Sequence, residues 1–448
     1  MTTQSRFAII GAGLAGCECA LALACAGLPV TLFEQKPVNH SAAHVSASLA
    51  ELVCSNSLRS DDPASAIGLL HNELRALGSA VMAAADACAV PADRALAVDR
   101  EEFSRLITSR VESASAIRLV RREITSLDDP ELVAAGPDGI VVSAGPLASD
   151  RLAASLGECL GAGYCYFYDA IAPIVWTDSL DMEVVFRASR HSEGEGDYLN
   201  CPFTREEYDR FYDALLAGQT YAGHAGESER HFGGCMPIEA LARAGRRTLA
   251  FGPLKPVGLV DPKSGKRPFA VLQLRAEQRE GATCNLVGCQ TKLLQGEQQR
   301  IFRLVPGLGQ AEFCRYGSMH RNTYVNAPAT LNADLSLKAA PGIYLAGQIT
   351  GVEGYVESAA TGLWLGLLLA ARAHGREVAQ PPADTALGAL LRHLATPVKD
   401  FQPSNVNFGL MPGLDERANK KERKNIYASR AQTAFALWHA QERENLGR

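Results

Sequence analysis

The sequence lacks the features that mark several large classes of protein. Its 12 cysteines include no C-x-x-C pair and no cysteine–histidine spacing typical of zinc, which argues against a disulfide framework and a metal site. The N-terminus has no basic region leading into an apolar core, and the most apolar late run, LWLGLLLAARAHG, is too short to cross a bilayer. We therefore expect a cytoplasmic protein with no metal and no membrane association.

Positive charge is not in excess either. The net charge of −5 means that no overall electrostatic field draws this protein onto nucleic acid, so an RNA partner would need a local basic patch. Two segments qualify, RAGRR at residues 243–247 and ANKKERKN at residues 418–425. Taken alone, each is typical of a solvated helix face or helix end. With 448 residues, the chain is longer than one core usually supports, and two domains are expected.

The first 34 residues carry the pattern of a dinucleotide-binding unit. The apolar run RFAII leads directly into GAGLAG, a helical stretch follows, and a second apolar run ends at Glu34. In this pattern Gly11 makes the tight turn, Gly13 lets the backbone approach a pyrophosphate, and Gly16 lets the helix pack on the strand. The helix N-terminus then faces the phosphates, and Glu34 accepts hydrogen bonds from the ribose. The predicted cofactor-binding residues of this unit are Gly11, Ala12, Gly13, Leu14, Ala15, Gly16 and Glu34.

Two later segments favour FAD over NAD. GIYLAGQITGVEGYVESAATGLWLG (342–366) is typical of a strand, a glycine-rich turn and a helix of small residues, and GIVVSAGPLAS (139–149) of a strand followed by a turn. Two-dinucleotide-fold flavoproteins bring such segments back against the first unit, beside the flavin. The later turn adds Gly347, Gly351, Gly354 and Tyr355 to the predicted cofactor-binding residues, with Glu353 beside them.

We predict an α/β fold with a Rossmann-like, glutathione-reductase-like FAD domain. This domain is discontinuous, formed by residues 1–165 and 329–448, and it encloses a mixed α/β insertion domain at residues 166–328. Within the insertion, TREEYDRFYDALLAG predicts a helix capped by Thr204, with Glu207 three residues on. The apolar spacing of this helix places Tyr208, Phe211, Tyr212 and Leu215 in a core.

Two cysteines differ from the others because they lie in polar or turn-like loops. Cys54 lies in ELVCSNSLRSDDP, where hydroxyl and amide groups and Arg59 can favour a reactive thiolate. Cys235 lies in GGCMP, a flexible turn upstream of several basic residues. On local sequence alone, each is also compatible with an incidental loop cysteine.

Longer blocks of sequence resemble one protein family. LVCSNSLRSD, DYLNCPFTREEY, GGCMPIEALARAGRRTLAFGPLKPVGL, GCQTKLLQGEQQRIFRLVPGL and YLAGQITGVEGYVESAATGL are similar to the folate- and FAD-dependent tRNA (uracil-5-)-methyltransferases. These bacterial flavoproteins make ribothymidine in the T-loop of tRNA, and a related flavoprotein that modifies the wobble uridine shares their flavin scaffold. The resemblance covers essentially the whole chain. The family often has an acidic residue where this chain has Gly233 or Gly234, so no carboxylate role is assigned there.

The resemblance implies a chemistry, its cofactors and its partners. FAD would be bound, 5,10-methylenetetrahydrofolate would give the carbon, NADH or NADPH would re-reduce the flavin, and the tRNA T-arm would be the partner, with no obligate protein partner. A thiolate adds to C6 of uracil, C5 attacks the one-carbon unit, and the C5 proton is removed. Hydride from reduced FAD then completes the methyl group, and the cysteine is expelled from C6. We assign Cys235 as the nucleophile and Cys54 as the group that takes the proton; a swapped or shared assignment stays open.

Other predictions are secondary. His320, Arg321 and Asn322 could contact folate or flavin, or form a buried polar cluster. Three other functions compete with the first: the same methylation of a ribosomal-RNA uridine, a flavin-dependent oxidoreductase that does not act on RNA, and a flavoprotein that only binds RNA. The oxidoreductase typically needs a second cysteine close to Cys54, which the sequence lacks. The predicted RNA-contacting residues are Arg243, Arg246, Arg247, Lys255, Lys420, Lys421, Arg423 and Lys424.

Overall fold

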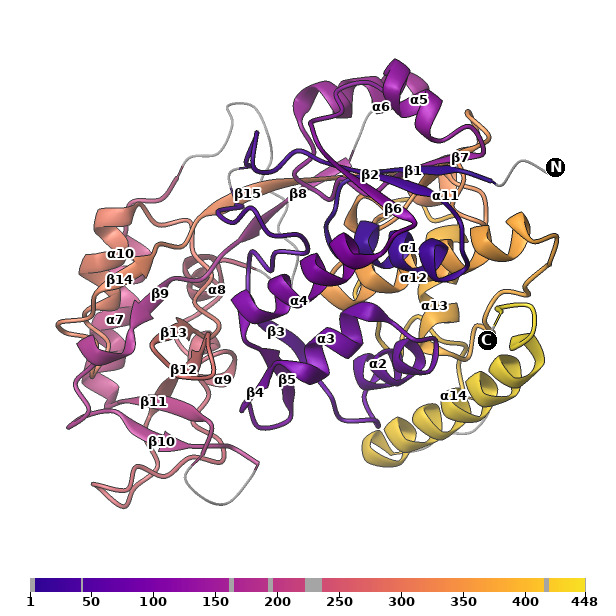
Figure 1. Ribbon diagram of the computed structural model, residues 1–448. Helices are drawn as coiled ribbons and strands as arrows, with labels where there is room; N and C mark the ends of the chain where they lie inside the picture. Colours follow the sequence, from indigo (N-terminus) through magenta and orange to yellow (C-terminus); the bar gives the residue numbers. More distant parts are fainter. Residues whose placement is uncertain are drawn as a thin grey trace.

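The computed structural model describes residues 5–41, 43–160, 165–191, 196–221, 236–414 and 419–447. Figure 1 shows a parallel sheet with its helices on one side of the molecule and an antiparallel sheet with its own helices on the other. Two long strands, β8 (Cys165–Ala170) and β15 (Met319–Tyr324), pair antiparallel and run between the two parts. The predicted class, an α/β fold with a Rossmann-like domain and an inserted mixed domain, matches this arrangement.

The parallel sheet brings the three predicted flavin segments together. Its order is β16-β7-β1-β2-β6, and all four pairings are parallel. Because parallel strands end at the same edge, the turns after β1, β7 and β16 meet there, which is where such sheets bind ligands. The strands are β1 (Phe7–Ile10), β2 (Val30–Glu34), β6 (Ile117–Arg121), β7 (Gly139–Val142) and β16 (Ile343–Leu345).

One helix of small residues packs on this sheet, and a second packs against the first. In α1 (Leu14–Cys25), Cys17 and Cys19 are fully buried, where thiols act as small hydrophobes. The apolar pattern of this segment predicted the same for Cys25, but that prediction is wrong, because Cys25 ends the helix and is exposed. The long helix α12 (Tyr355–Ala373) lies against α1 so closely that a Cβ on Gly362 would overlap the Ala15 backbone. This contact anchors the start of α12 beside the first glycine turn.

The remainder of this domain consists of short strands and surrounding helices. A small antiparallel sheet has the order β3-β5-β4. No helix in the described part of the chain is long and apolar enough to span a membrane. The elements are β3 (Ser57–Ser60), α2 (Ala66–Ala76), α3 (Ala80–Ala87), β4 (Ala89–Val90), β5 (Ala95–Val98), α4 (Arg100–Ser113), α5 (Pro130–Ala135), α6 (Asp150–Leu160), α11 (Ala327–Thr330), a 3-10 turn (Gln348–Thr350), α13 (Ala386–Ala395) and α14 (Lys420–Glu442).

The insertion contains an antiparallel sheet with its own apolar core. Its order is β10-β11-β12-β13-β9-β14. The elements are β9 (Ile174–Trp176), a 3-10 turn (Thr177–Ser179), β10 (Phe186–Ala188), β11 (Tyr198–Phe203), α7 (Arg205–Ala217), α8 (Ile238–Arg243), α9 (Thr248–Phe251), β12 (Ala270–Ala276), β13 (Thr283–Leu286), α10 (Gln295–Phe302) and β14 (Phe313–Arg315). The domain boundaries at residues 166 and 328 stay a prediction.

The helix predicted from TREEYDRFYDALLAG is confirmed as α7. The Thr204 side chain accepts a hydrogen bond from the Glu207 backbone at 3.3 Å, and the Glu207 carboxylate accepts from the Thr204 backbone at 2.8 Å. These reciprocal bonds form the expected capping box. The four predicted core residues of this helix are all buried.

Candidate active site

The turn between β1 and α1 uses its three glycines in different ways. Gly11 has a φ of +94°, and a Cβ there would lie 2.6 Å from the Ser143 carbonyl oxygen. A Cβ on Gly16 would overlap the carbonyl oxygen of Gly11. Gly13 has a φ of −73°, and a Cβ there would meet no atom within 4 Å. Packing thus requires the first and third glycines, whereas the second faces open space, as a turn that admits a pyrophosphate should.

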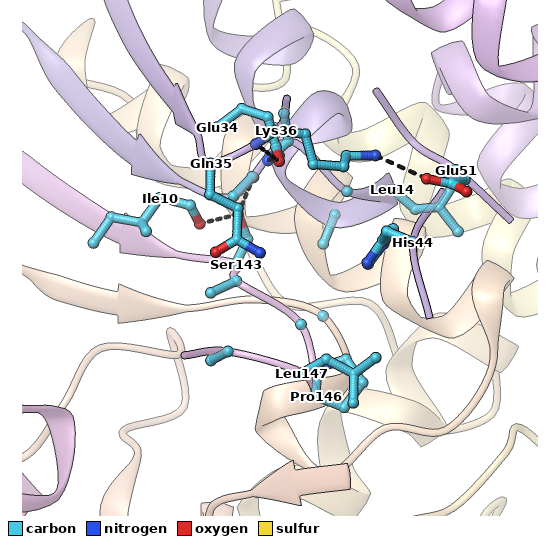
Figure 2. A pocket seen from close by; sticks show the side chains of 18 of the residues that line it. Ile10, Leu14, Glu34, Gln35, Lys36, His44, Glu51, Ser143, Pro146 and Leu147 are labelled. Atoms are coloured by element: carbon cyan, nitrogen blue, oxygen red, sulfur yellow. Dashed lines mark hydrogen bonds and ion pairs between the residues drawn. The ribbon is translucent and has the colours of Figure 1, made fainter. Parts of the chain in front are cut away.

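This turn forms one wall of a pocket lined by all three predicted flavin segments (Figure 2). Residues 10–15, 143–149 and 347–348 surround this pocket, which opens to solvent. The Ser143 hydroxyl donates to the carbonyl oxygens of Ile10 and Gly11, each at 2.9 Å. Ser143 was not predicted, and it ties the end of β7 to the glycine turn.

Glu34 lies at the pocket beside the glycine turn. It is 6% exposed, and its carboxylate accepts from the Ala12 backbone at 2.8 Å and from the Lys36 backbone at 2.9 Å. Each carboxylate oxygen has a second lone pair, so Glu34 can still accept from a ribose hydroxyl. The residues present therefore fit a dinucleotide whose pyrophosphate meets the N-terminus of α1 and whose ribose meets Glu34.

Sequence reasoning missed three polar residues on the same wall. Lys36 forms an ion pair with Glu51 at 3.1 Å, and Figure 2 shows His44 close to both. Burial and the Lys36 charge lower the pKa of His44, so its ring is neutral at pH 7. These residues lie in a loop without periodicity, and only the fold brings them to the pocket.

The glycines of the late turn differ in position. Gly347, at a φ of +83°, lines the dinucleotide pocket. Gly354, at a φ of +115°, lines a second pocket. Gly351 lines neither of these pockets; a Cβ there would overlap the Phe401 ring, so this glycine serves packing.

The second pocket contains Cys54 and adjoins the first. It opens to solvent and shares five lining residues with the dinucleotide pocket, namely Val53, Pro146, Leu147, Gln348 and Tyr355. Asn322, which is 3% exposed, also lines this second pocket. A thiol therefore lies immediately beside the predicted flavin site.

Tyr355 holds the backbone of the Cys54 loop. Its hydroxyl oxygen accepts from the backbone N–H groups of Cys54 at 2.7 Å and Ser55 at 3.1 Å. Burial, and then the proximity of Cys54, raise the pKa of Tyr355 well above its usual value. Its phenol is therefore neutral at physiological pH and acts here as a positioning group.

Two arginines hold the same loop. Arg100 donates to the Leu52 carbonyl at 2.6 Å and forms an ion pair with Glu277 at 2.7 Å. Arg275, 6% exposed, donates to the Ser55 hydroxyl at 2.6 Å and to the Asn56 side chain at 2.8 Å. Because Arg275 and Glu277 come from the insertion, the Cys54 loop is fixed by both parts of the molecule.

A sequence signal for these contacts existed in the strand LQLRAE. On β12, Leu272 and Leu274 belong to the insertion core, and the alternate residues Gln273 and Arg275 are buried on the other face. Polar residues alternating with core leucines indicate a strand whose second face is buried against a polar partner.

Arg59 and Glu357 form an ion pair at the edge of the Cys54 pocket. The Glu357 side chain is fully buried and also accepts from the Val406 backbone at 2.8 Å. Burial raises the pKa of Glu357, and the Arg59 charge opposes that rise. Glu353 accepts from the Gln348 side chain at 2.6 Å, on the turn between the two pockets.

Some of the predicted RNA-contacting residues are exposed, and others form ion pairs within the protein. Arg243, Arg247, Lys255 and Arg423 are exposed. Arg246 instead forms ion pairs with Asp209 at 2.9 Å and Asp213 at 2.5 Å. Lys424 forms an ion pair with Asp62 at 2.9 Å and so helps hold α14 against the domain.

Some predicted site residues lie outside the described part of the chain. Cys235 and the neighbouring Gly233 and Gly234 are among them. The side chains of His320, Arg321, Lys420 and Lys421 are likewise outside it.

Comparisons with known proteins agree with the predicted family. The model of the family "Glucose inhibited division protein A" matches residues 6–377. The methylenetetrahydrofolate–tRNA-(uracil-5-)-methyltransferase TrmFO of Oleidesulfovibrio alaskensis is 60% identical over 440 residues, covering 98% of each chain. The protein of the same name from Lawsonia intracellularis is 56% identical, covering 97% of each chain.

The fold also matches a solved structure. Aquifex aeolicus GidA (form II crystal) superposes with a TM-score of 0.68 over 98% of this chain and 74% of that one, at 16% identity, which supports the fold alone. Taken with the sequence relatives, this protein belongs to the glucose-inhibited division protein A family and, within it, to the methylenetetrahydrofolate–tRNA-(uracil-5-)-methyltransferases.

Proposed function

We propose that this protein methylates C5 of the T-loop uridine of tRNA, taking the carbon from 5,10-methylenetetrahydrofolate. FAD, kept reduced by NADH or NADPH, supplies the hydride when bound. The observation that carries the proposal is the position of Cys54, in a pocket that shares a wall with the dinucleotide pocket, in a chain 60% identical to a relative named for this reaction.

The cofactor would be held mainly by backbone groups. The N-terminus of α1 would meet the pyrophosphate, with Gly13 leaving room for its close approach, and the Glu34 carboxylate would accept from the ribose. Gly347 lines the same pocket, and Tyr355 lines both this pocket and the one that contains Cys54. The proposed cofactor-binding residues are Gly11, Ala12, Gly13, Leu14, Ala15, Gly16, Glu34, Gly347, Gly354 and Tyr355; the predicted Gly351 is kept only as a residue that shapes the turn by packing against Phe401.

We propose that the two cysteines carry out different steps of the reaction. Uracil C5 becomes nucleophilic only after a thiolate adds to C6, which is the role we assign to Cys235. Once C5 carries the new carbon, its proton must leave, and Cys54 takes it. Proton transfer needs a group held at a constant short distance, and the bonds from Tyr355, Arg100 and Arg275 hold the Cys54 loop in that way.

The RNA would be held next to these thiols by exposed cations. Arg243, Arg247 and Lys255 are exposed, and their charges are available to phosphates, whereas two aspartates already share the charge of Arg246. Because the net charge is −5, binding would rest on such local contacts and fall steeply with salt.

The direct test is product formation from unmodified tRNA. Wild type, incubated with tRNA, methylenetetrahydrofolate and NADPH, should yield 5-methyluridine detected by nucleoside mass spectrometry. Cys54→Ala should abolish it, whereas Cys25→Ala, which removes an exposed thiol that lines neither site pocket, should not. No product from protein with bound, reducible flavin would refute the proposal, and product only from a ribosomal-RNA fragment would change the substrate.

The assignment of the two thiols needs a separate experiment. A tRNA carrying 5-fluorouridine traps the C6 adduct, because the fluorine cannot leave as a proton does. Cys54→Ala should still form this covalent complex and Cys235→Ala should not. The opposite result would reverse the roles.

A further inference from the structure

The segment after α8 places apolar side chains in solvent. In α9, Leu249 and Ala250 are buried in the insertion core, but Phe251, its last residue, is 77% exposed. No other large aromatic side chain in the described ranges is as exposed. Val257 and Val260, in the loop that follows, are 55% and 58% exposed. An apolar cluster on one short segment suggests a binding surface.

Exposed cations precede and follow this aromatic residue in the chain. The Phe251 N–H donates to the Arg247 carbonyl at 3.1 Å, so the two residues are one helical turn apart and share a face of α9. The chain then turns back, since the Lys255 N–H donates to the Gly252 carbonyl at 3.3 Å. Arg247 and Lys255 are exposed, and neither side chain has an ion-pair partner among the described residues. Arg246 differs, because carboxylates of α7 already pair with it.

We propose that Phe251 stacks on an unpaired base of the tRNA substrate while Arg247 and Lys255 contact the adjoining phosphates. The inference rests on the proposed function and adds how the RNA is recognised. A flat exposed ring with free cations close to it in the chain suits a polyanion with exposed π-faces, which is single-stranded nucleic acid. Bases in a duplex are already stacked, so a loop would supply the partner, and the target uridine must itself leave its stack to react.

The test compares tRNA affinity across salt concentrations for a set of variants. Phe251→Ala should weaken binding of an unmodified tRNA transcript roughly tenfold or more, with an unchanged salt slope. Phe251→Trp should restore the affinity. Lys255→Gln should instead lower the salt slope by about one, because it removes a phosphate contact. Trp176→Ala removes another aromatic ring of the insertion that is 44% exposed, and it should leave the tRNA affinity and the salt slope unchanged.

Two further measurements make the result decisive. A fully paired RNA duplex should bind Phe251→Ala and wild type equally, because it offers no free base. Equal tRNA affinity of Phe251→Ala and wild type would overturn the inference, as would full rescue by Phe251→Leu, which keeps apolar bulk without a π-face. The Trp and Leu variants decide the question even if the alanine variant folds poorly. Formation of 5-methyluridine by wild type is measured in parallel. If wild type forms no product, the proposed function is refuted, whereas the stacking inference is refuted only by the affinity measurements.

Discussion

Replacing Gly13 by alanine tests whether the open side of the glycine turn is where the dinucleotide approaches. The backbone there, at φ −73° and ψ −167°, is accessible to alanine, and the new Cβ would meet no atom within 4 Å. The protein without FAD should therefore fold normally and gain about 0.4–1 kcal/mol, because alanine restricts the unfolded chain. The same methyl group fills the space next to the N-terminus of α1, where the pyrophosphate would lie.

The expected loss of affinity can be estimated from the bonds at risk. Moving the pyrophosphate away from the α1 N-terminus removes one or two charge-assisted hydrogen bonds, each worth about 1.5–3 kcal/mol. A loss of about 3 kcal/mol weakens FAD binding by about 100-fold. We therefore expect a variant as stable as wild type but purified largely without flavin.

Gly16→Ala is the matched control, since it adds the same methyl group three residues later. There the Cβ would overlap the Gly11 carbonyl and lie 2.6 Å from the Ser143 hydroxyl. α1 must then move off the sheet, at a cost of about 1–3 kcal/mol or more even without FAD. This variant should lose both stability and cofactor.

The assay is thermal unfolding with and without FAD, together with a Kd from flavin fluorescence. FAD at 100 times its Kd should stabilise wild type by about 2.7 kcal/mol and leave the Gly13→Ala melting temperature nearly unchanged. The reasoning is refuted if Gly13→Ala binds FAD as tightly as wild type. It is also refuted if Gly13→Ala without FAD has a melting temperature as low as that of Gly16→Ala.

Three further outcomes are expected. Glu73 is 3% exposed, and burial raises its pKa from 4.5 to about 8, so the folded protein keeps a proton that the unfolded chain releases. The free energy of unfolding should therefore fall by several kcal/mol as the pH rises from 4.5 to about 8. Glu73→Gln should flatten this part of the pH dependence measured by urea unfolding. Arg275→Leu leaves a buried Asn56 oxygen without its donor, which should lower the free energy of unfolding by about 1–3 kcal/mol. The variant should also form 5-methyluridine more slowly than wild type at unchanged FAD content. A wild-type rate would show that this contact does not position the Cys54 loop. Arg59→Gln leaves the buried Glu357 carboxylate without its cation and should lower the stability measured by thermal unfolding by about 1–3 kcal/mol. This cost is smaller than for a fully buried ion pair, because the Arg59 side chain is 37% exposed. Adding Glu357→Gln should recover most of the lost stability, and no recovery would contradict the ion-pair explanation.

Features that depend on near neighbours were predictable from the sequence. The glycine turn after β1 and the capping box of α7 each use groups a few residues apart, so their residue types and spacing carry the information. The late strand, turn and helix at 343–373 were recognisable for the same reason. Family blocks then added the chemistry that no local pattern contains.

The arrangement around the thiol was decided by tertiary structure. Arg275 and Asn56 are 219 residues apart in the chain, yet they share a hydrogen bond of 2.8 Å. Likewise, Arg246 and Arg247 are equivalent in sequence, but α7 supplies aspartates to the first only. The sequence by itself determined the dinucleotide unit, the two candidate thiols and the family. Which polar groups hold Cys54, and which cations are left for RNA, depended on distances in space, because a charge is neutralised or a loop fixed only by the groups that folding brings within a few ångströms.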